Sequence, residues 1–253
     1  ISYMAGSDVP ALIVNVQRGG PGLGGIQPSQ ADYFQATRAL GHGDFQVLVF
    51  APATVQEIMD LVYLAFDRAE EYRVPAMILA DGMLGQMMEP VVIEKPGAAS
   101  GHQNKRRHNI INSLYMQAEE LENRVIERYK RYEIIKEKEQ RAEEYLMEDA
   151  EIAVVAYGAT SRIVKAAVKE AREQGVKAGC IRPITLWPYP TDTIAKYVNQ
   201  VKCFLSVEMS MGQMVEDVRL AVNGAVPLEF YGRTGGVIPE PGEVLAKIME
   251  LGR

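Results

Sequence analysis

The sequence predicts an α/β protein of two doubly wound, three-layer domains, on three observations. Apolar runs of strand length alternate with segments whose apolar residues recur at helical spacing. The alternation occurs twice, at 1–94 and at 150–253, with a highly charged segment at 95–149 between them. Of the 253 residues, 47% are apolar and 24% are charged, so the chain can bury two cores of ordinary size.

The first domain is predicted to contain parallel strands joined by helices. Apolar runs predict strands at 11–16, 47–51 and 76–80, and a helix is expected at about 32–40. Thr54 and Glu57 form a capping-box pattern at the start of a second helix. The order strand, helix, strand indicates parallel strands that end at one edge of the sheet. Segments near Arg18 and Asp81 would emerge at this carboxyl edge, where open α/β sheets bind ligands.

The segment 95–149 is expected to connect the two domains. Its first part is polar with few structural signals, and its second part alternates charges among good helix formers. This pattern is typical of a solvated helix or helical pair. Coiled-coil pairing is an alternative, although apolar residues are not sustained at the a and d positions.

The second domain repeats the order of strand and helix. A buried strand is expected at 152–157, followed by a helix that Thr160 or Ser161 caps. Further strands are expected at 178–181, 203–207 and 228–231, and helices at 191–199, 212–222 and 240–251. No GxSxG or GxxxxGK motif occurs here. Glu208 and Arg182 are interpreted either as an internal ion pair or as contacts to a partner.

The composition argues against several classes of function. A net charge of −6, with acids and bases mixed along the chain, offers no basic stripe for nucleic acid. No apolar run approaches the roughly 20 residues of a membrane span, and no signal peptide is recognisable, so a soluble, cytoplasmic protein is expected. Cys180 and Cys203 are too few to hold an iron–sulfur cluster and are interpreted as strand core residues. The three histidines lack ligand spacing, so no metal site is expected.

The glycine-rich stretch VNVQRGGPGLGG at 14–25 is the most informative motif. It formally satisfies G-x-G-x-x-G, but a dinucleotide site needs a helix that opens at the third glycine, and Ile-Gln-Pro-Ser follows instead. Arg18, at the junction of strand and turn, offers a planar fork for a substrate carboxylate. A salt bridge at a surface turn is the alternative. His42, in a second turn, could exchange protons near neutral pH or donate a hydrogen bond to a substrate carbonyl, or could have no such role.

Seven motifs in order resemble one family. They are VNVQRGGPGLG, GHGDFQVLVFAPATVQE, ILADGMLGQMMEPV, VVAYGATSRIVKAAV, IRPITLWPYP, VEMSMGQMVEDVRLAVNG and EFYGRTGG. Together they resemble the alpha subunit of 2-oxoacid:ferredoxin oxidoreductases, most closely the branched-chain 2-oxoisovalerate type. The resemblance implies the C-terminal part of a thiamine-diphosphate pyrimidine-binding domain at 1–94 and a transketolase C-terminal-like domain at 150–253.

The resemblance also implies an activity, cofactors and partners. The activity is the oxidative decarboxylation of a 2-oxoacid in anaerobic metabolism, with electrons passed to ferredoxin and the acyl group to coenzyme A. Thiamine diphosphate with magnesium would be shared with a beta subunit, and iron–sulfur clusters would lie on that subunit and on ferredoxin-like gamma and delta subunits, with none on this chain. A homo- or hetero-oligomer without nucleic acid or membrane partners is expected.

Not every part of the family's site is present. The sequence starts with Ile1 rather than Met, and a strand is expected within ten residues, so an N-terminal part of the natural protein is expected to precede it. In the family, the glutamate that activates the cofactor lies upstream of residue 11. The chain alone is therefore expected to be inactive, and its cofactor-binding residues stay undefined.

The resemblance places substrate contacts on the two glycine turns. The expected substrate-binding residues are Arg18, Gly19, Gly20, Leu23 and Asp44, and the expected catalytic residue is His42. Relatives that use 2-oxoglutarate often carry Ser-Thr-Gly where this chain has Gly-Leu-Gly at 22–24. If Leu23 or Ile26 faces the pocket, the second carboxylate of 2-oxoglutarate would be left unpaired at a cost of roughly several kcal/mol. An aliphatic 2-oxoacid is therefore expected.

Two other classes of function stay open. One is the beta-type component of a lipoamide-linked 2-oxoacid dehydrogenase, which has the same two-domain order. The other is a non-catalytic binding or regulatory module that uses the second domain as an interaction platform.

Overall fold

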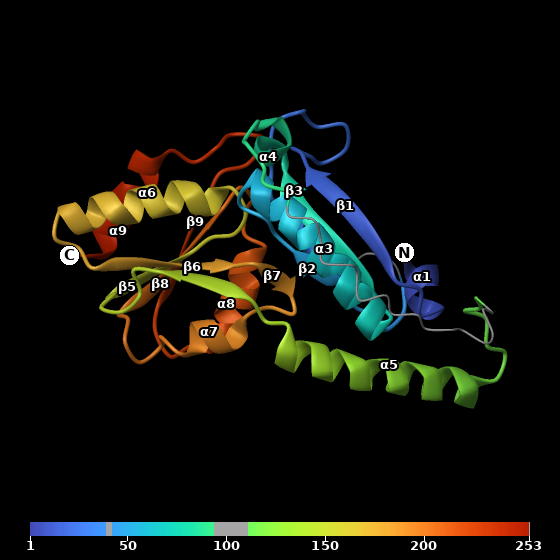
Figure 1. Ribbon diagram of the computed structural model, residues 1–253. Helices are drawn as coiled ribbons and strands as arrows, with labels where there is room; N and C mark the ends of the chain where they lie inside the picture. The colour runs from blue at the N-terminus through green and yellow to red at the C-terminus, as the bar shows by residue number, and fades with distance from the viewer. Residues whose placement is uncertain (39–41, 94–110, 253) are drawn as a thin grey trace.

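The computed structural model describes residues 1–38, 42–93 and 111–252, and it contains two sheets side by side (Figure 1). In chain order the elements are α1 (Ser2–Gly6), β1 (Ala11–Gln17), α2 (Tyr33–Arg38), β2 (Leu48–Phe50), α3 (Val55–Tyr72), β3 (Pro75–Asp81), α4 (Gly82–Gln86), α5 (Ala118–Lys138), β4 (Ala142–Tyr145), β5 (Ile152–Val155), α6 (Thr160–Glu173), β6 (Ala178–Pro183), β7 (Thr185–Trp187), α7 (Thr191–Ala195), β8 (Cys203–Glu208), α8 (Met214–Val222), β9 (Leu228–Gly232) and α9 (Pro241–Leu251). The predicted α/β class is confirmed.

The first sheet has the order β1-β3-β2-β7, with β1, β3 and β2 parallel. Gln17 lies beside Asp81 in the register of β1 and β3, so both strands end at the same edge, as expected. The antiparallel strand β7 comes from the second half of the chain. The sequence did not predict β7, because a three-residue strand is too short to show a period.

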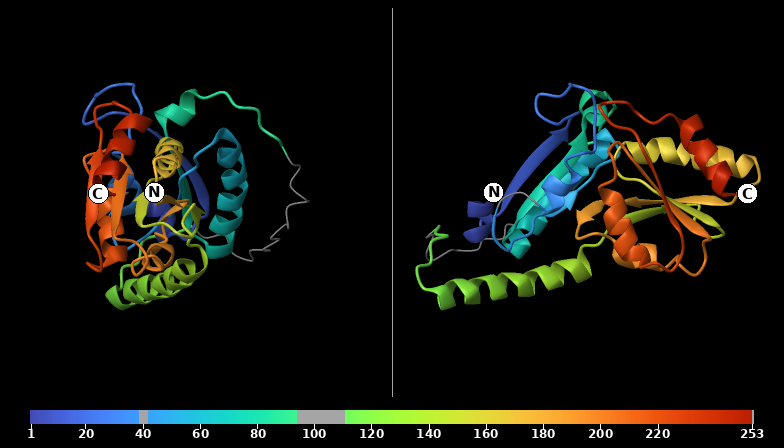
Figure 2. Two further views of the ribbon diagram at one scale, coloured as in Figure 1. Left: turned by 90° about the vertical axis from the view of Figure 1, so that its left-hand side faces the viewer. Right: turned by 180° about the vertical axis from the view of Figure 1, so that it is seen from behind.

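The second sheet has the order β4-β6-β5-β8-β9, and only β4 is antiparallel. Helices α6 and α9 pack together on one face, and α7 and α8 pack together on the other (Figure 2). This is the predicted doubly wound arrangement. The core under α8 also includes Val49 and Leu79 of the first sheet, so the two sheets share one apolar interior.

The segment 95–149 supplies one described helix, α5, and also the strand β4. Only Arg128, Tyr132 and Ile135 of α5 are buried, and the Tyr132 ring lies 5.5 Å from that of Trp187. One contact per turn is enough to attach a helix that is otherwise solvated. None of the described helices is long and apolar enough to cross a lipid bilayer.

The start of α6 differs from the prediction. Thr160 and Ser161 lie inside the first turn, and neither caps the helix. The Ser161 hydroxyl donates to the Gly158 carbonyl at 2.7 Å, and the Thr160 hydroxyl donates to Gln30 Oε1 at 3.0 Å. Both hydroxyls are thus engaged in tertiary or turn contacts. The Ala159 N–H instead donates to Asp81 Oδ2 at 3.3 Å.

Cys180 and Cys203 lie in β6 and β8, and both are buried free thiols, as predicted. Burial raises the pKa of Cys180 to about 12. Because the thiolate is the reactive form, we expect Cys180 to react with a disulfide reagent at mildly alkaline pH roughly a thousandfold more slowly in the native protein than in urea. Ellman titration of a Cys203→Ala variant with and without urea measures this. Labelling of native Cys180 at the unfolded rate would contradict it.

Candidate functional site

The carboxyl ends of strands in both sheets meet at one junction. Asp81, the last residue of β3, accepts from Ala159 just after β5. Gln30 contacts Tyr157, which follows β5, and Met209, which follows β8. Since ligands of parallel α/β sheets bind beyond the carboxyl ends of the strands, this junction is the candidate site.

The loop 18–28, between β1 and this junction, is closed by its own backbone. Gly19 N–H donates to the Gln27 carbonyl at 2.8 Å, and Gly25 N–H donates to the Gly19 carbonyl at 2.9 Å. A side chain at Gly24, where φ is +47°, would overlap the Gly19 carbonyl, so glycine is required there. The next helix, α2, begins only at Tyr33. A helix therefore does not open at the third glycine, and the dinucleotide alternative does not fit.

The side chain of Arg18 bonds backbone carbonyls of this loop. Its Nη1 donates to the carbonyls of Leu23 and Gly25, the second at 3.0 Å. Among the described residues no carboxylate pairs with Arg18, so the surface salt bridge considered from the sequence is not seen in this part of the chain. Arg18 is exposed, and no described residue bonds its Nε or Nη2. That edge of the guanidinium has the fork geometry that a carboxylate pairs with.

The side chain of Gln30 joins the segment after the loop to the second sheet. Gln30 is fully buried, and its Nε2 donates to the Tyr157 carbonyl at 2.9 Å. Its Oε1 accepts from the Thr160 hydroxyl and from Met209 N–H, each at 3.0 Å. The position of the loop relative to the second sheet is therefore set by a buried amide whose nitrogen and oxygen both have partners.

Glu208, the last residue of β8, caps helix α8 from within the core. It is fully buried, and its two oxygens accept from the backbone N–H groups of Gln213, Met214 and Val215 at 2.8–2.9 Å. The hydroxyl of Ser206 donates to Oε1 at 3.0 Å, and that of Ser210 to Oε2 at 2.9 Å. An internal ion pair with Arg182 was one interpretation of the sequence. It is wrong, because the described structure satisfies Glu208 with hydrogen bonds alone.

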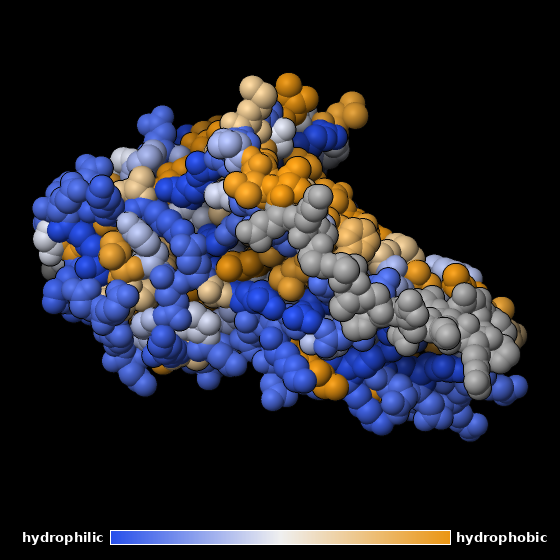
Figure 3. All heavy atoms as spheres, viewed as in Figure 1, coloured by the Kyte–Doolittle hydropathy of each residue, from blue (hydrophilic) through white to orange (hydrophobic). Residues whose placement is uncertain are grey.

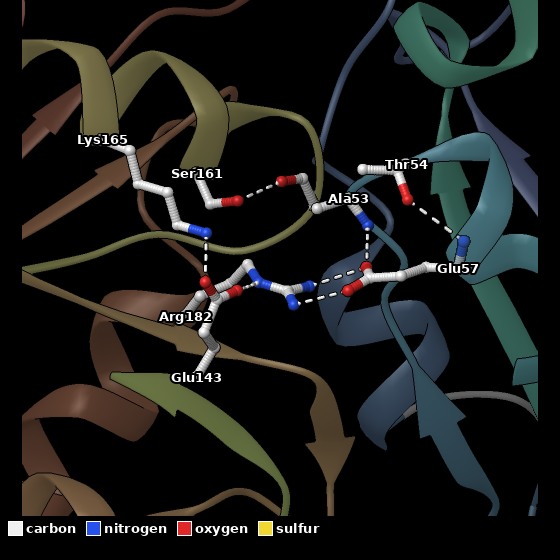
Figure 4. A network of polar contacts seen from close by, with 8 residues as sticks. Ala53, Thr54, Glu57, Glu143, Ser161, Lys165 and Arg182 are labelled. Atoms are coloured by element: carbon white, nitrogen blue, oxygen red, sulfur yellow. Dashed lines mark hydrogen bonds and ion pairs between the residues drawn. The ribbon is translucent and has the colours of Figure 1, made fainter. Parts of the chain in front are cut away.

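Arg182 makes the ion pairs instead, and they join the two sheets (Figure 4). Its guanidinium pairs bidentately with Glu57 of α3 at 2.7 and 2.9 Å. Its Nε donates to Glu143 of β4 at 2.7 Å, and Lys165 of α6 donates to the other oxygen of Glu143. Glu57 also accepts from Ala53 N–H at 2.7 Å. The side chain of Arg182 is 4% exposed, so this is a nearly buried clamp between the domains.

The helices that start at the junction already have carboxylates at their N-termini. Asp81 Oδ1 accepts from Met83 and Leu84 at the start of α4, at 3.0 and 3.1 Å. Burial raises the pKa of Asp81, although its backbone hydrogen bonds oppose this. At the start of α3, Glu89 accepts from Val55 N–H at 3.0 Å. A phosphate group bound at a helix N-terminus needs these N–H groups free.

These described N-termini therefore do not fit the diphosphate of a thiamine cofactor. A diphosphate would have to displace Asp81, Glu89 or Glu208, each of which already bonds the helix amides. In the part of the chain that the structure describes, no group of three or more His, Cys, Asp or Glu side chains is arranged to hold a metal ion.

The predicted site residues lie in two places. Gly19, Gly20 and Leu23 lie with Arg18 in the loop at the junction, and Leu23 is 92% exposed at its tip. The turn with His42 and Asp44 lies at the opposite edge of the first sheet, where both residues line a hollow of about 370 Å³ together with Ser2 and Tyr3 of α1. Strands of seven residues separate the two edges, a distance of roughly 20 Å. Within one chain, Arg18 and His42 cannot contact the same small substrate.

The sequence did not predict the role of Gln30, the pairing of Glu57 with Arg182, or the capping of α8 by Glu208. The only local signal is the run Ser206-Val-Glu208-Met-Ser210, in which polar residues alternate at the end of a buried strand. Such alternation normally indicates a half-exposed strand, so the burial of all three polar side chains was not predictable from the pattern.

Family models match most of the chain. The model described as "Pyruvate flavodoxin/ferredoxin oxidoreductase, thiamine diP-bdg" matches residues 1–176. The model described as "Pyruvate:ferredoxin oxidoreductase core domain II" matches residues 150–244. The second match covers most of the second sheet and its helices.

Known proteins agree with these matches. Ketoisovalerate oxidoreductase subunit VorB of Methanothermobacter marburgensis is 44% identical over 260 residues, which cover 99% of this chain and 73% of that protein. 2-Oxoglutarate synthase subunit KorA of Methanothermobacter thermautotrophicus is 33% identical and is matched over 100% of this chain and 76% of its own length. A structure of 2-oxoglutarate:ferredoxin oxidoreductase from Magnetococcus marinus superposes with a TM-score of 0.82 at 22% identity, over 99% of this chain and 50% of that chain. This last likeness shows the fold, and the chain spans about half the length of that solved protein.

Proposed function

The chain belongs to the thiamine-diphosphate-dependent 2-oxoacid:ferredoxin oxidoreductase family, and on that premise we propose that it serves an enzyme that oxidatively decarboxylates 2-oxoisovalerate. The observation that carries the choice of substrate is the identity of 44% with VorB over nearly the whole chain, against 33% with KorA. In this proposal the chain is an alpha-type subunit in the cytoplasm, electrons pass to ferredoxin, and the acyl group passes to coenzyme A.

In this proposal, two polypeptides together form the binding site of the cofactor. Bound thiamine diphosphate would supply the carbanion chemistry of decarboxylation. The N-termini of α4, α3 and α8 are occupied by Asp81, Glu89 and Glu208, which supports a diphosphate and magnesium site on a separate beta subunit. Iron–sulfur clusters on the beta subunit and on ferredoxin-like gamma and delta subunits would accept the electrons. In the same proposal, 1–94 is part of the pyrimidine-binding domain, 95–149 is the connector, and 150–253 is the transketolase C-terminal-like domain.

The loop 18–28 would bind the 2-oxoacid. The Nε and Nη2 edge of Arg18 would pair with the carboxylate, with Gly19 and Gly20 allowing close approach. Leu23 and Ile26 are 92% and 80% exposed, so the loop presents two apolar side chains that can cover a branched aliphatic substrate. His42 and Asp44 enter the proposal only as residues of a site formed with another polypeptide, because they lie at the opposite edge.

Substrate preference tests the proposed function. The complete complex should turn over 2-oxoisovalerate with a kcat/KM roughly a hundredfold above that for 2-oxoglutarate, because an apolar wall leaves the second carboxylate unpaired. Leu23→Ser should lower kcat/KM for 2-oxoisovalerate by about tenfold, whereas Leu23→Met, which keeps the apolar contact, should change it little. A wild-type complex that prefers 2-oxoglutarate would contradict the proposed substrate.

Arg18 is tested separately. Arg18→Lys keeps the positive charge but loses the bidentate fork, so KM for the 2-oxoacid should rise by about a hundredfold while KM for coenzyme A stays unchanged. Steady-state kinetics of the complete complex with each substrate varied in turn measure both constants. Equal changes in the two constants would mean that Arg18 only holds the loop.

A further inference from the structure

Helix α5 presents a second face that nothing in the described chain covers. The buried residues Arg128, Tyr132 and Ile135 attach it to the first sheet along one side. Figures 1 and 2 show its N-terminal half extending along the first sheet toward α1, away from the second sheet. On its outer side Ile126 is 47% exposed and Tyr129 is 37% exposed. Ile126 and Tyr129 are thus two of four large apolar side chains exposed on this helix, the others being Leu121 and Ile134.

These side chains form a groove with charged edges. The groove has a volume of about 610 Å³ and is lined by Asp44, Val125, Ile126, Tyr129, Lys130 and Glu133. Aromatic and aliphatic side chains in a hollow with a charged rim are typical of the centre and rim of a protein interface. In Figure 3 hydrophilic residues predominate along α5, whereas apolar residues gather over the first sheet.

The charges of α5 indicate which partner fits. Its first half, 118–128, carries four acidic and two basic residues, a net charge of −2. Its second half, 129–138, carries four basic and two acidic residues, a net charge of +2. An identical helix laid antiparallel places each acidic half against a basic half, whereas a parallel copy places like charges together. A helix with this distribution is electrostatically complementary to itself.

We propose that this outer face of α5 pairs with the same face of a second copy of the chain, antiparallel and around a two-fold axis near Tyr129. Glu122, Tyr129 and Lys136 recur every seven residues and therefore lie along one line of the helix surface. A two-fold axis at Tyr129 sets Glu122 of each chain opposite Lys136 of the other. Among the described residues, the Lys136 ammonium pairs with Glu133, three residues away, at 2.8 Å, and the Lys136 side chain is 47% exposed.

The pairing is expected to be weak and sensitive to salt. A single helix pair buries on the order of 1,000 Å², at the low end of specific interfaces. The exposed pairs between Glu122 and Lys136 are screened at high ionic strength. A monomer–dimer equilibrium that shifts toward monomer with added salt is therefore the expected behaviour.

Sedimentation equilibrium of the 253-residue chain tests the proposal. The wild type should form a dimer at high micromolar concentration, and Tyr129→Glu should abolish it. Glu122→Lys should weaken the dimer by roughly tenfold, and the double variant Glu122→Lys with Lys136→Glu should restore it. Glu70→Lys makes the same charge change at an exposed position of α3 and should have no effect.

Each other outcome overturns the proposal. A wild-type chain that stays monomeric means that some other molecule, or none, covers the groove. A dimer that survives both Tyr129→Glu and Glu122→Lys uses a different surface. A double variant as weak as the single one contradicts the antiparallel register. Circular dichroism and the fluorescence of Trp187, the single tryptophan of the sequence, show whether each variant is folded.

Discussion

Replacing Glu208 by leucine is expected to lower the free energy of unfolding by about 3–5 kcal/mol. The substitution removes the acceptor of three backbone N–H groups at the start of α8, at Gln213, Met214 and Val215. It also removes the acceptor of the Ser206 and Ser210 hydroxyls. One buried group left without a partner costs about 1–3 kcal/mol, and the freed hydroxyls can turn to other acceptors, so the total stays below the sum of five separate losses. Urea unfolding followed by the fluorescence of Trp187 measures the loss.

Glu229→Leu is the matched control for this prediction. Glu229 lies on β9 of the same sheet and is exposed, so its replacement should change the free energy of unfolding by no more than about 0.5 kcal/mol. The loss of unfolding free energy for Glu208→Gln should lie between those of Glu208→Leu and Glu229→Leu. An amide keeps one acceptor oxygen but turns two donor hydrogens toward helix N–H groups. Equal stabilities of the Glu208 and Glu229 variants would show that the cap contributes little.

Replacing Arg182 by methionine is expected to cost about 2–4 kcal/mol and to loosen the contact between the two sheets. The substitution leaves Glu57 and Glu143 without their shared cation, and only Lys165 still neutralises Glu143. The cost is below that of a fully buried pair, because Glu57 and Glu143 are 29% and 36% exposed. Urea midpoints measure the stability, and proteolysis of the native protein reports the loosening.

Lys247→Met serves as the control, since Lys247 pairs with Glu250 on the exposed side of α9 and its loss should cost about 0.5 kcal/mol or less. A double-mutant cycle with Glu57→Gln isolates the ion pair from the packing of the arginine stem. If the coupling energy between Arg182 and Glu57 is zero, the clamp is a packing contact only.

The clamp also predicts how stability depends on pH. Burial raises the pKa of Glu143, but the hydrogen bonds from Lys165 and Arg182 outweigh burial and hold this pKa below its usual value. A carboxyl with a lowered folded pKa contributes stability above its unfolded pKa of 4.5 and loses it as the pH falls through the folded value. Arg182→Met should therefore reduce the acid-induced loss of stability below about pH 4.5. Thermal melts across this range show whether it does.

Much of the fold was predictable because it rests on local patterns. The apolar runs of β1, β3, β5, β6 and β8 and the capping pattern at Thr54 each indicate their own element. The strands β4 and β7 were missed, because their pairing with β6 and β2 depends on distant residues. The coupling of Gln30 to Tyr157 and Met209, across more than a hundred residues, likewise leaves no local signal.

By itself, the sequence determined the α/β class, the repeated strand and helix order, the family resemblance and the position of Arg18 after a buried strand. Only the tertiary structure decided that Arg18 and His42 lie at opposite edges of one sheet, and that Glu208 and Arg182 have separate partners. The physical reason is the distance along the chain over which each interaction acts. Hydrophobic periodicity and helix capping act between neighbours in the chain, whereas the partner of a buried charge is whichever group the packing of the two sheets brings within hydrogen-bond distance.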